Sequence, residues 1–267
     1  MKEAQPRAIR LEDYKPSAFL ISQTDLVFEL YDDFAEITNE MALSANPKAP
    51  PEDDLVLDGQ GLELVSLALD GCELEASQYQ LDKDSLTVFK VPRQFTLRTV
   101  CRIKPQQNKS LEGLYRSGGM FCTQCEAEGF RKITFYLDRP DVMATFTTRI
   151  EADKTLYPVL LANGNPVEEG NLDDDRHFAV WEDPFVKPAY LFAAVAGDLV
   201  RHDDTFVTQS GRDVSLRIFS EPHNAHKTTF ALESLKKSMK WDEERFGREY
   251  DLDIFMIVAS DFFNMGA

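Results

Sequence analysis

Residues 25–43 read "DLVFELYDDFAEITNEMAL", and their side chains alternate as those of two neighbouring strands do. In an extended chain, successive side chains point to opposite faces. One face of the first half carries Leu26, Phe28 and Leu30, and the other carries Asp25, Val27 and Glu29. The turn signal "YDDF" (31–34) follows, and Ile37, Met41 and Leu43 then mark a second segment. We therefore predict a strand, a turn and a second strand.

Similar short segments recur over the first two thirds of the chain. The candidate strands are residues 62–69, 86–91, 95–103, 130–137, 142–152, 157–162, 177–181 and 190–196. Turn signals lie between them: "DG" at 58–59 and 70–71, "NGN" at 163–165, and "EDPF" at 182–185. Many short strands at this spacing predict a mainly β fold, either an antiparallel sandwich or a saddle-like antiparallel sheet.

The pattern changes near residue 197. Between residues 226 and 246, apolar residues recur at three- and four-residue steps, which predicts a helix. Its predicted inward face is Ala231, Leu235, Met239, Asp242 and Phe246. Gly247 is the predicted C-terminal stop. The stretch "DIFMIVAS" (253–260) is apolar on both faces and predicts a fully buried strand.

These segments divide the chain into a β domain of residues 1–198 and the first segment of an α/β domain, residues 199–267. A buried strand needs partners on both sides and cover on both faces, and the second part supplies few of these. We therefore expect the sequence to belong to a longer protein. The alternative is a complete protein with a short C-terminal lobe.

Composition excludes several classes of partner. Apolar residues make up 43% of the 267 residues and charged residues 28%, the profile of a globular protein. The net charge of −17 and the pI near 4.7 disfavour nucleic acid and membrane surfaces, and favour cationic ligands such as a peptide α-ammonium. No signal-like apolar segment opens the chain, and no run of about 18 apolar residues occurs. Four cysteines are too few for a disulfide scaffold, so we expect reduced thiols and a cytoplasmic protein.

The stretch "FCTQCEAEGF" (121–130) contains a C-x-x-C pair, Cys122 and Cys125. A structural zinc site needs a second pair of ligands, but Cys72 and Cys101 are far apart in the sequence. A redox dithiol would open a helix in a βαβ unit, whereas strands are predicted here. The interpretation that requires neither a second ligand pair nor a βαβ unit is two buried, reduced thiols.

Neither the histidines nor the common nucleotide-binding and hydrolase motifs indicate an active site. "HNAH" (223–226) has a spacing that a helical metal pair could use, but Pro222 precedes it and the H-E-x-x-H pattern is absent. No G-x-G-x-x-G, P-loop or G-x-S-x-G occurs in the sequence. Loop or cap histidines are the simpler interpretation.

Three long segments nevertheless resemble the bacterial aminopeptidase N family of zinc metallopeptidases. They are "CTQCEAEGFRKITFYLDRPDVMATFTTRIEADK" (122–154), "WEDPFVKPAYLFAAVAGDL" (181–199) and "SMKWDEERFGREYDLDIFMIVASDFFNMGA" (238–267). The first resembles the family's substrate-amine segment, the second its junction between domains, and the third the approach to its G-A-M-E-N motif. The resemblance covers nearly the whole chain. It implies a saddle-like β domain followed by the start of a thermolysin-like catalytic domain.

The resemblance also implies roles for particular residues. Glu126 matches the carboxylate that binds the α-ammonium of the substrate, and Gln124 matches a polar residue of the same pocket. Gly266 and Ala267 match the first two letters of G-A-M-E-N, and Met265 resembles a flexible residue lining the pocket for the first side chain. An ammonium is what distinguishes a peptide N-terminus from an internal amide, so a fixed carboxylate suits an exopeptidase.

The zinc chemistry of the family lies outside the sequence given. The zinc helix H-E-x-x-H, the third ligand and the family's catalytic tyrosine are absent, so the resemblance places the zinc ligands beyond residue 267. We expect no zinc in residues 1–267 alone and no hydrolysis by them. The expected partners of the parent enzyme are peptides with a free N-terminal amine. Two alternatives stay open: a non-catalytic peptide-binding or interaction β module, and a zinc-ribbon-like binder using Cys122 and Cys125.

Overall fold

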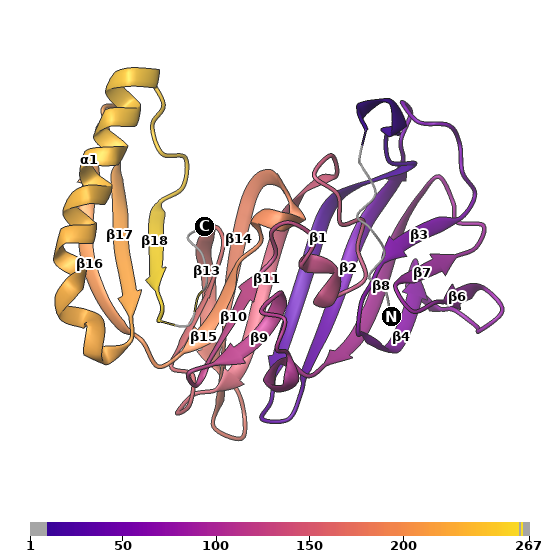
Figure 1. The fold of residues 1–267 in the computed structure, drawn as a ribbon, viewed down its shortest axis with the longest axis horizontal. Helices are drawn as coiled ribbons and strands as arrows, with labels where there is room; N and C mark the ends of the chain where they lie inside the picture. The colour runs from indigo at the N-terminus through magenta and orange to yellow at the C-terminus, as the bar shows by residue number, and fades with distance from the viewer. Residues whose placement is uncertain (1–9, 262, 264–267) are drawn as a thin grey trace.

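The computed structural model describes residues 10–261 and 263, and within them the protein is mainly β (Figure 1). The largest sheet has eight strands in the order β13-β14-β11-β1-β2-β8-β4-β5. Their bounds are β1 (Phe19–Leu30), β2 (Ala35–Ala45), β4 (Glu63–Leu69), β5 (Cys72–Glu73), β8 (Gln94–Ile103), β11 (Met143–Asp153), β13 (Asn165–Asn171) and β14 (Arg176–Pro188).

Three smaller sheets complete the fold. A four-stranded sheet has the order β12 (Val159–Ala162), β15 (Ala194–Gly197), β10 (Met120–Gln124) and β9 (Gly113–Ser117). Two three-stranded sheets consist of β3 (Leu55–Asp58), β7 (Ser85–Val88) and β6 (Tyr79–Leu81), and of β16 (Val200–Val207), β17 (Asp213–Ser220) and β18 (Ile254–Ala259). The helical segments are η1 (Leu11–Asp13), η2 (Pro105–Gln107), η3 (Phe130–Lys132), η4 (Ala189–Leu191), η5 (Pro222–Lys227) and α1 (Thr228–Phe246).

The opening strand pair is confirmed. β1 and β2 are antiparallel neighbours, with Phe28 opposite Ile37. The apolar side chains that alternate along both strands are buried in the main core. The largest sheet is nevertheless mixed rather than purely antiparallel, because β1 pairs with β11 in parallel. A parallel pair needs a long crossover, and more than a hundred residues separate these two strands along the chain.

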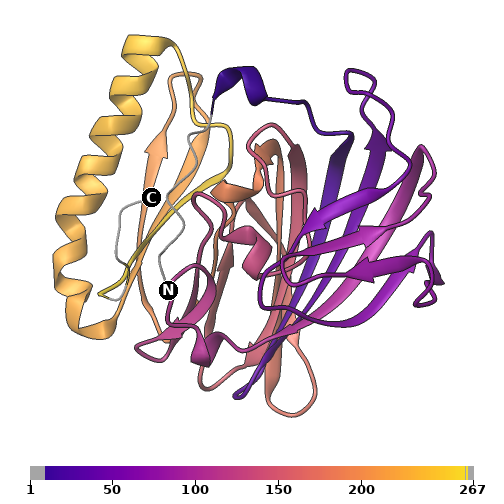
Figure 2. The ribbon, with the colours of Figure 1, turned by 45° about the vertical axis from the view of Figure 1, so that its right-hand side comes forward.

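The main core lies between the eight-stranded sheet and the four-stranded sheet, which Figures 1 and 2 show as neighbouring layers. An aromatic cluster fills part of this space. Phe130 contacts Tyr136 with ring centroids 4.7 Å apart, and Phe28 stacks on Phe192 at 5.8 Å. Sheet residues and loop residues thus share one core.

The predicted strand at residues 130–137 is wrong. This segment begins with the 3-10 helix η3 and continues as irregular chain with one isolated bridge, between Asp58 and Tyr136. All residues from 133 to 138 are buried. A segment enclosed between layers shows no alternation of exposure, so its many apolar residues do not indicate a strand.

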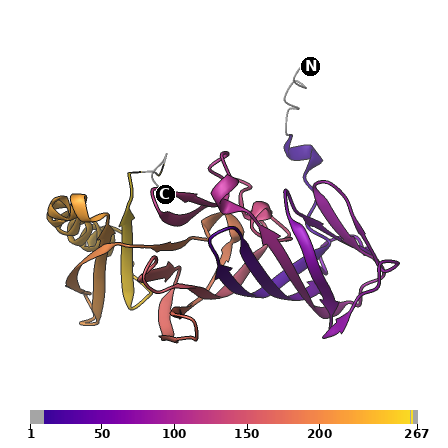
Figure 3. The ribbon, with the colours of Figure 1, turned by 90° about the horizontal axis from the view of Figure 1, so that it is seen from below.

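The C-terminal part contains a β17-α1-β18 crossover. Figures 1 and 3 show α1 lying against the β16-β17-β18 sheet at one end of the molecule. The predicted helix is confirmed, and so is its stop: Gly247 has φ 62° and its N–H donates to the carbonyl of Glu243. The predicted inward face is partly wrong, because Asp242 and Phe246 are exposed. The buried face is Thr228, Leu232, Leu235, Met239 and Glu243. The Glu243 carboxylate satisfies the Gln209 amide at 3.2 Å, which explains a charged residue on that face.

β18 is less buried than predicted. Only Ile254 is fully buried among its residues, since β17 is the one strand that pairs with β18 in the described part of the chain. Its two faces nevertheless have different neighbours. Met256 and Val258 pack with the main core, whereas Phe255 and Ile257 pack with the cluster beneath α1. Apolar residues on both faces of β18 therefore connect the C-terminal sheet with the main core.

Across residues 10–261 and 263, no helix combines the length and apolarity that a membrane crossing requires.

Candidate functional site

The candidate site is the turn that follows β10. Gln124, the last residue of β10, pairs with Gly113 at the start of β9. One residue earlier, the Thr123 hydroxyl accepts the Ala194 amide at 2.9 Å, at the start of β15. Because these strands are antiparallel, β10 ends where its two neighbours begin, at the same end of the four-stranded sheet. The turn therefore rests on a rigid support.

Two glycines allow the turn to lie close against these strand ends. The Gly129 amide donates to the Cys125 carbonyl at 2.8 Å and closes the turn. A Cβ atom on Gly129 would lie 2.3 Å from the carbonyl oxygen of Gln124 and 3.0 Å from the amide nitrogen of Gly113. Gly113 has φ +71°, and a Cβ there would lie 2.7 Å from the Cβ of Lys132. Both positions therefore require glycine.

Gln124 and Glu126 lie on the same turn. Gln124 is buried, and its side-chain Nε2 donates to the Glu126 carbonyl at 3.1 Å. The Glu126 side chain is exposed on the turn, and its carboxylate has no ion-pair partner among the residues that the structure describes. An exposed carboxylate on a tightly held backbone is available to an incoming cation. The substrate-binding roles of both residues stay predictions. Met265, Gly266 and Ala267 lie outside the described residues.

The sequence reasoning missed the charged network that holds the far end of this turn. The Arg131 guanidinium donates from Nε to Asp138 Oδ2 at 3.1 Å and from Nη2 to the Asp138 carbonyl at 3.0 Å. The backbone amide of Arg131 donates to the same carboxylate oxygen at 3.1 Å. Nη1 lies 3.6 Å from Asp58 Oδ1, and Nη2 lies 3.5 Å from Glu128 Oε1. The available signal was that Arg131 and Asp138 flank the largely apolar residues 133–137.

The Arg131–Asp138 part of this network is buried, whereas the side chains of Asp58 and Glu128 are partly or largely exposed. The Asp138 side chain is 2% exposed and that of Arg131 is 14% exposed. Burial raises the pKa of Asp138 above its ordinary value, and the hydrogen bonds from Arg131 oppose that rise. The same competition acts on Asp58, where burial raises the pKa and Arg131 opposes it. The Arg131–Asp138 ion pair is therefore shielded from solvent.

The cysteines are placed as packing residues. Cys101, Cys122 and Cys125 are buried free thiols, and Cys72 is an exposed one. Burial raises the pKa of all three buried thiols, that of Cys101 to about 12, so they remain protonated and unreactive at neutral pH. No cluster of three or more histidine, cysteine, aspartate or glutamate side chains suited to a metal ion occurs in residues 10–261 and 263.

The histidines make local contacts. His223 Nε2 lies 2.7 Å from Asp261 Oδ2, and the Asn224 amide donates to Asp261 Oδ1 at 2.9 Å. His202 Nδ1 lies 2.8 Å from the Thr228 hydroxyl near the start of α1. His223, with its exposed side chain, fits the interpretation of a loop or cap histidine, whereas His202 lies within β16.

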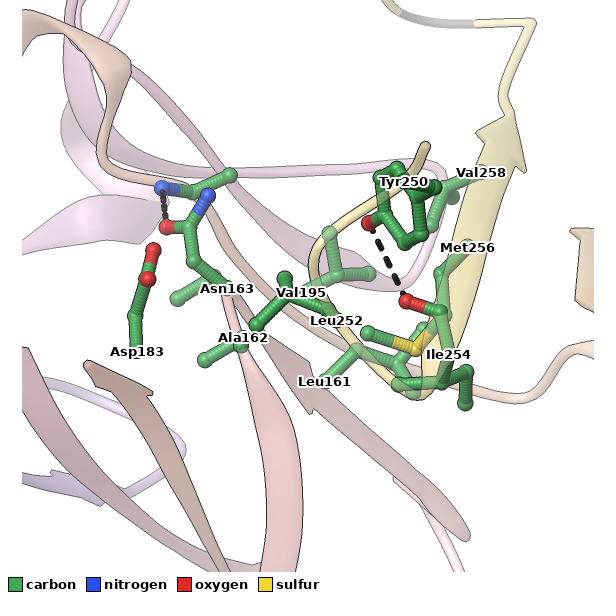
Figure 4. Close-up of a pocket in the computed structure, with 13 residues that line it drawn as sticks. Leu161, Ala162, Asn163, Asp183, Val195, Tyr250, Leu252, Ile254, Met256 and Val258 are labelled. Carbon is green, nitrogen blue, oxygen red and sulfur yellow. Dashed lines mark hydrogen bonds between the residues drawn. The ribbon is translucent and has the colours of Figure 1, made fainter. Parts of the chain in front are cut away.

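A separate pocket lies between β18 and the four-stranded sheet (Figure 4). Met256 and Val258 of β18 face Leu161 and Val195 of the four-stranded sheet across it. The Asn163 Oδ1 accepts the Ala193 amide at 2.6 Å along its rim. The acidic member of the lining, Asp183, is paired with Lys187 at 2.9 Å. The pocket is thus mainly apolar, and its one carboxylate is already neutralised.

Comparison with known proteins agrees with this architecture. Residues 23–191 match the family model of the peptidase M1 N-terminal domain. The chain belongs to the peptidase M1 family. The turn that carries Glu126 lies within the matched part of this M1 domain.

Two relatives of this M1 chain are named aminopeptidase N. The protein from Caulobacter vibrioides is 53% identical over 267 residues, which are 100% of this chain and 31% of that protein. The protein from Escherichia coli K12 is 50% identical over 264 residues, 98% of this chain and 30% of that protein. The chain therefore spans about a third of the length of these relatives.

Solved structures show the same fold. Legionella pneumophila aminopeptidase A, solved in complex with aspartic acid, has a TM-score of 0.89 and 35% identity. That match covers 94% of this chain and 30% of the Legionella chain. A mutant M1 zinc metallopeptidase from Deinococcus radiodurans, bound to a Tyr-Ser-Ala substrate, has a TM-score of 0.77 and 17% identity, with 91% of this chain and 57% of that chain covered. At that identity, the second likeness shows the fold alone.

Proposed function

We propose that the chain is the N-terminal portion of a zinc aminopeptidase that releases N-terminal amino acids from peptides. The observation that carries the proposal is the exposed Glu126 carboxylate, held on a turn whose backbone is fixed by Gln124 and Gly129. The family membership and the names of the relatives support it. In this function Glu126 binds the substrate α-ammonium, with Gln124 beside it.

Recognition of a free amine follows from this placement. An internal amide carries no charge, whereas a terminal ammonium donates charge-assisted hydrogen bonds to a carboxylate. Hydrogen bonds of this kind contribute about 1.5–3 kcal/mol, because one partner is ionised. A carboxylate on a mobile loop would lose part of this energy in ordering its backbone. The fixed turn avoids that loss.

The residues described here do not fit a zinc ion. No suitable cluster of ligands occurs among them, so no step of peptide hydrolysis is assigned to this chain. In the proposed enzyme, zinc ligands lie beyond residue 267. Met265, Gly266 and Ala267 are proposed to line the substrate site from the C-terminal side.

The finer division of the fold belongs to the same proposal. Residues 1–198 form the saddle-like β domain, and residues 199–267 form the first segment of a thermolysin-like catalytic domain. The β17-α1-β18 crossover supports the second assignment, since it is the α/β unit of the described chain. We also propose a cytoplasmic location, which the four free cysteines support.

The test is Glu126→Gln in a polypeptide that continues beyond residue 267 through the rest of the proposed enzyme. We expect kcat/KM for free-amine peptide substrates to fall about 10- to 100-fold, because the lost interaction is charge-assisted. Unfolding temperature should be unchanged. Glu169→Gln, an equally conservative change at an exposed position of β13, is the matched control. Normal activity and KM in Glu126→Gln would show that the amine is bound elsewhere.

A further inference from the structure

The turn that carries Glu126 has two ends, and they are held differently. At its first end, β10 holds the backbone through pairing with β9 and β15. At its second end there is no strand, since η3 and irregular chain follow. The backbone there is fixed by Arg131, whose amide and guanidinium both bind Asp138.

Arg131 also joins the turn to a third segment. Its carbonyl accepts the Gln60 amide at 2.8 Å, just after β3, and its guanidinium faces Asp58 at the end of β3. The Asp138 amide in turn donates to Asp58 Oδ2 at 3.3 Å. The second end of the turn, the segment around residue 138 and β3 thus meet at one guanidinium. The guanidinium of arginine holds its donors in a rigid planar fork, whereas the donors of a lysine ammonium are fewer and gathered at one rotatable atom.

From this geometry we propose that Arg131 is a positioning residue for amine recognition: bound to Asp138 and Asp58, it fixes the second end of the turn that presents Glu126. This inference rests on the proposed function. It assigns to Arg131 no contact with substrate, because its side chain is mostly enclosed by its partners.

The charges of the network suit a cationic ligand. A guanidinium near Glu126 would by itself weaken the attraction for an ammonium. Here Asp58, Glu128 and Asp138 surround the single positive charge of Arg131, within 3.6 Å in each case. The network therefore holds the turn without leaving a net positive charge beside the amine-binding carboxylate.

The first arm of the test uses the 267-residue chain itself. Arg131→Lys keeps the charge and removes the fork, so we expect the Gly129 amide to exchange its hydrogen about tenfold faster in the native state. The matched control is Arg139→Lys. Arg139 makes a similar fork to Asp141, at 2.8 Å from both Nε and Nη2, outside the turn. Arg139→Lys should leave exchange at Gly129 unchanged, and an unchanged rate in Arg131→Lys would overturn the proposal.

The second arm measures amine recognition in the longer protein. Two competitive inhibitors are compared, an α-amino hydroxamate and the same hydroxamate without its amine. The ratio is the inhibition constant of the amine-free compound divided by that of the α-amino compound. It reports binding of the ammonium, which a purely structural role of Arg131 would not alter. We expect Arg131→Lys to lower this ratio about tenfold and Arg139→Lys to leave it at the wild-type value.

Glu126→Gln separates the two possible failures. If Glu126→Gln leaves the ratio unchanged, the proposed function is wrong. If Glu126→Gln lowers the ratio and Arg131→Lys does not, the positioning role is wrong and the function stands. Should Arg131→Lys fail to fold, Asp58→Asn removes the longer, half-exposed contact instead. It should lower the ratio in the same direction, by about threefold, and an unchanged ratio would again overturn the proposal.

Discussion

Replacing Gly129 by alanine tests the close packing on which the candidate site depends. The added Cβ would lie 2.3 Å from the carbonyl oxygen of Gln124, and 3.0 Å from both the Cα of Cys125 and the amide nitrogen of Gly113. All three are backbone atoms, so no change of rotamer can relieve the contacts. The turn or the strand ends beneath it must move apart.

The expected magnitude follows from two opposing effects. Gly129 has φ −80° and ψ −18°, a conformation that alanine adopts without strain. In open space the substitution would therefore stabilise the protein by about 0.4–1 kcal/mol, through the entropy of the unfolded chain. Overpacking a rigid site costs about 1–3 kcal/mol. Because the shortest contact is with a backbone oxygen, we expect the higher cost, and a net loss of about 2 kcal/mol.

Urea unfolding, followed by the fluorescence of buried Trp181, measures this loss. Gly170→Ala in β13 is the control. A Cβ on Gly170 would lie 2.8 Å from the ring of Phe178, a side chain that can turn aside. We expect that variant to stay within about 1 kcal/mol of wild type. A Gly129→Ala protein as stable as wild type would refute the close approach of the turn to β9.

Two further predictions concern thiols and a buried ion pair. Cys72 is the exposed thiol, so a disulfide dye should titrate one thiol rapidly in the native protein and all four in urea. The Cys72→Ser variant should lack the rapid phase. A rapid reaction in that variant would contradict the burial of the other three thiols. Lys187→Met leaves the Asp183 carboxylate without the ammonium 2.9 Å away, and should lower the free energy of unfolding by about 3 kcal/mol at neutral pH. Burial lowers the pKa of Lys187 from 10.5, so the unfolded state binds more protons between the folded pKa and 10.5. Wild-type stability should therefore gain from a rise in pH across that window, and urea midpoints of Lys187→Met should lack this gain.

Much of the β architecture was predictable because exposure alternates along its strands. The pair β1 and β2 has one face in the core and one toward solvent, and this leaves a two-residue period in the sequence. Gly247 was predictable for a similar reason, since a left-handed helix end selects glycine. The proximity of Gln124 and Glu126 followed from their spacing in the chain.

Segments enclosed by several elements were not predictable in this way. The largely apolar residues 130–137 predict a strand, but residues 133–137 are buried on all sides, which leaves no period to distinguish strand from turn. The inward face of α1 shifted for a different reason. Glu243 is buried with the Gln209 amide as its partner, and sequence patterns assign a glutamate to solvent.

The sequence by itself determined the local features: the alternating strands, the helix with its glycine stop, and a glutamine two residues before a carboxylate. Each depends on residues close together along the chain, which leave a periodic or motif signal. Only the tertiary structure decided the parallel pairing of β1 with β11 and the meeting of Arg131, Asp138 and Asp58. These join residues far apart in sequence, and the desolvation that makes such a charged network tight exists only once the surrounding layers have packed.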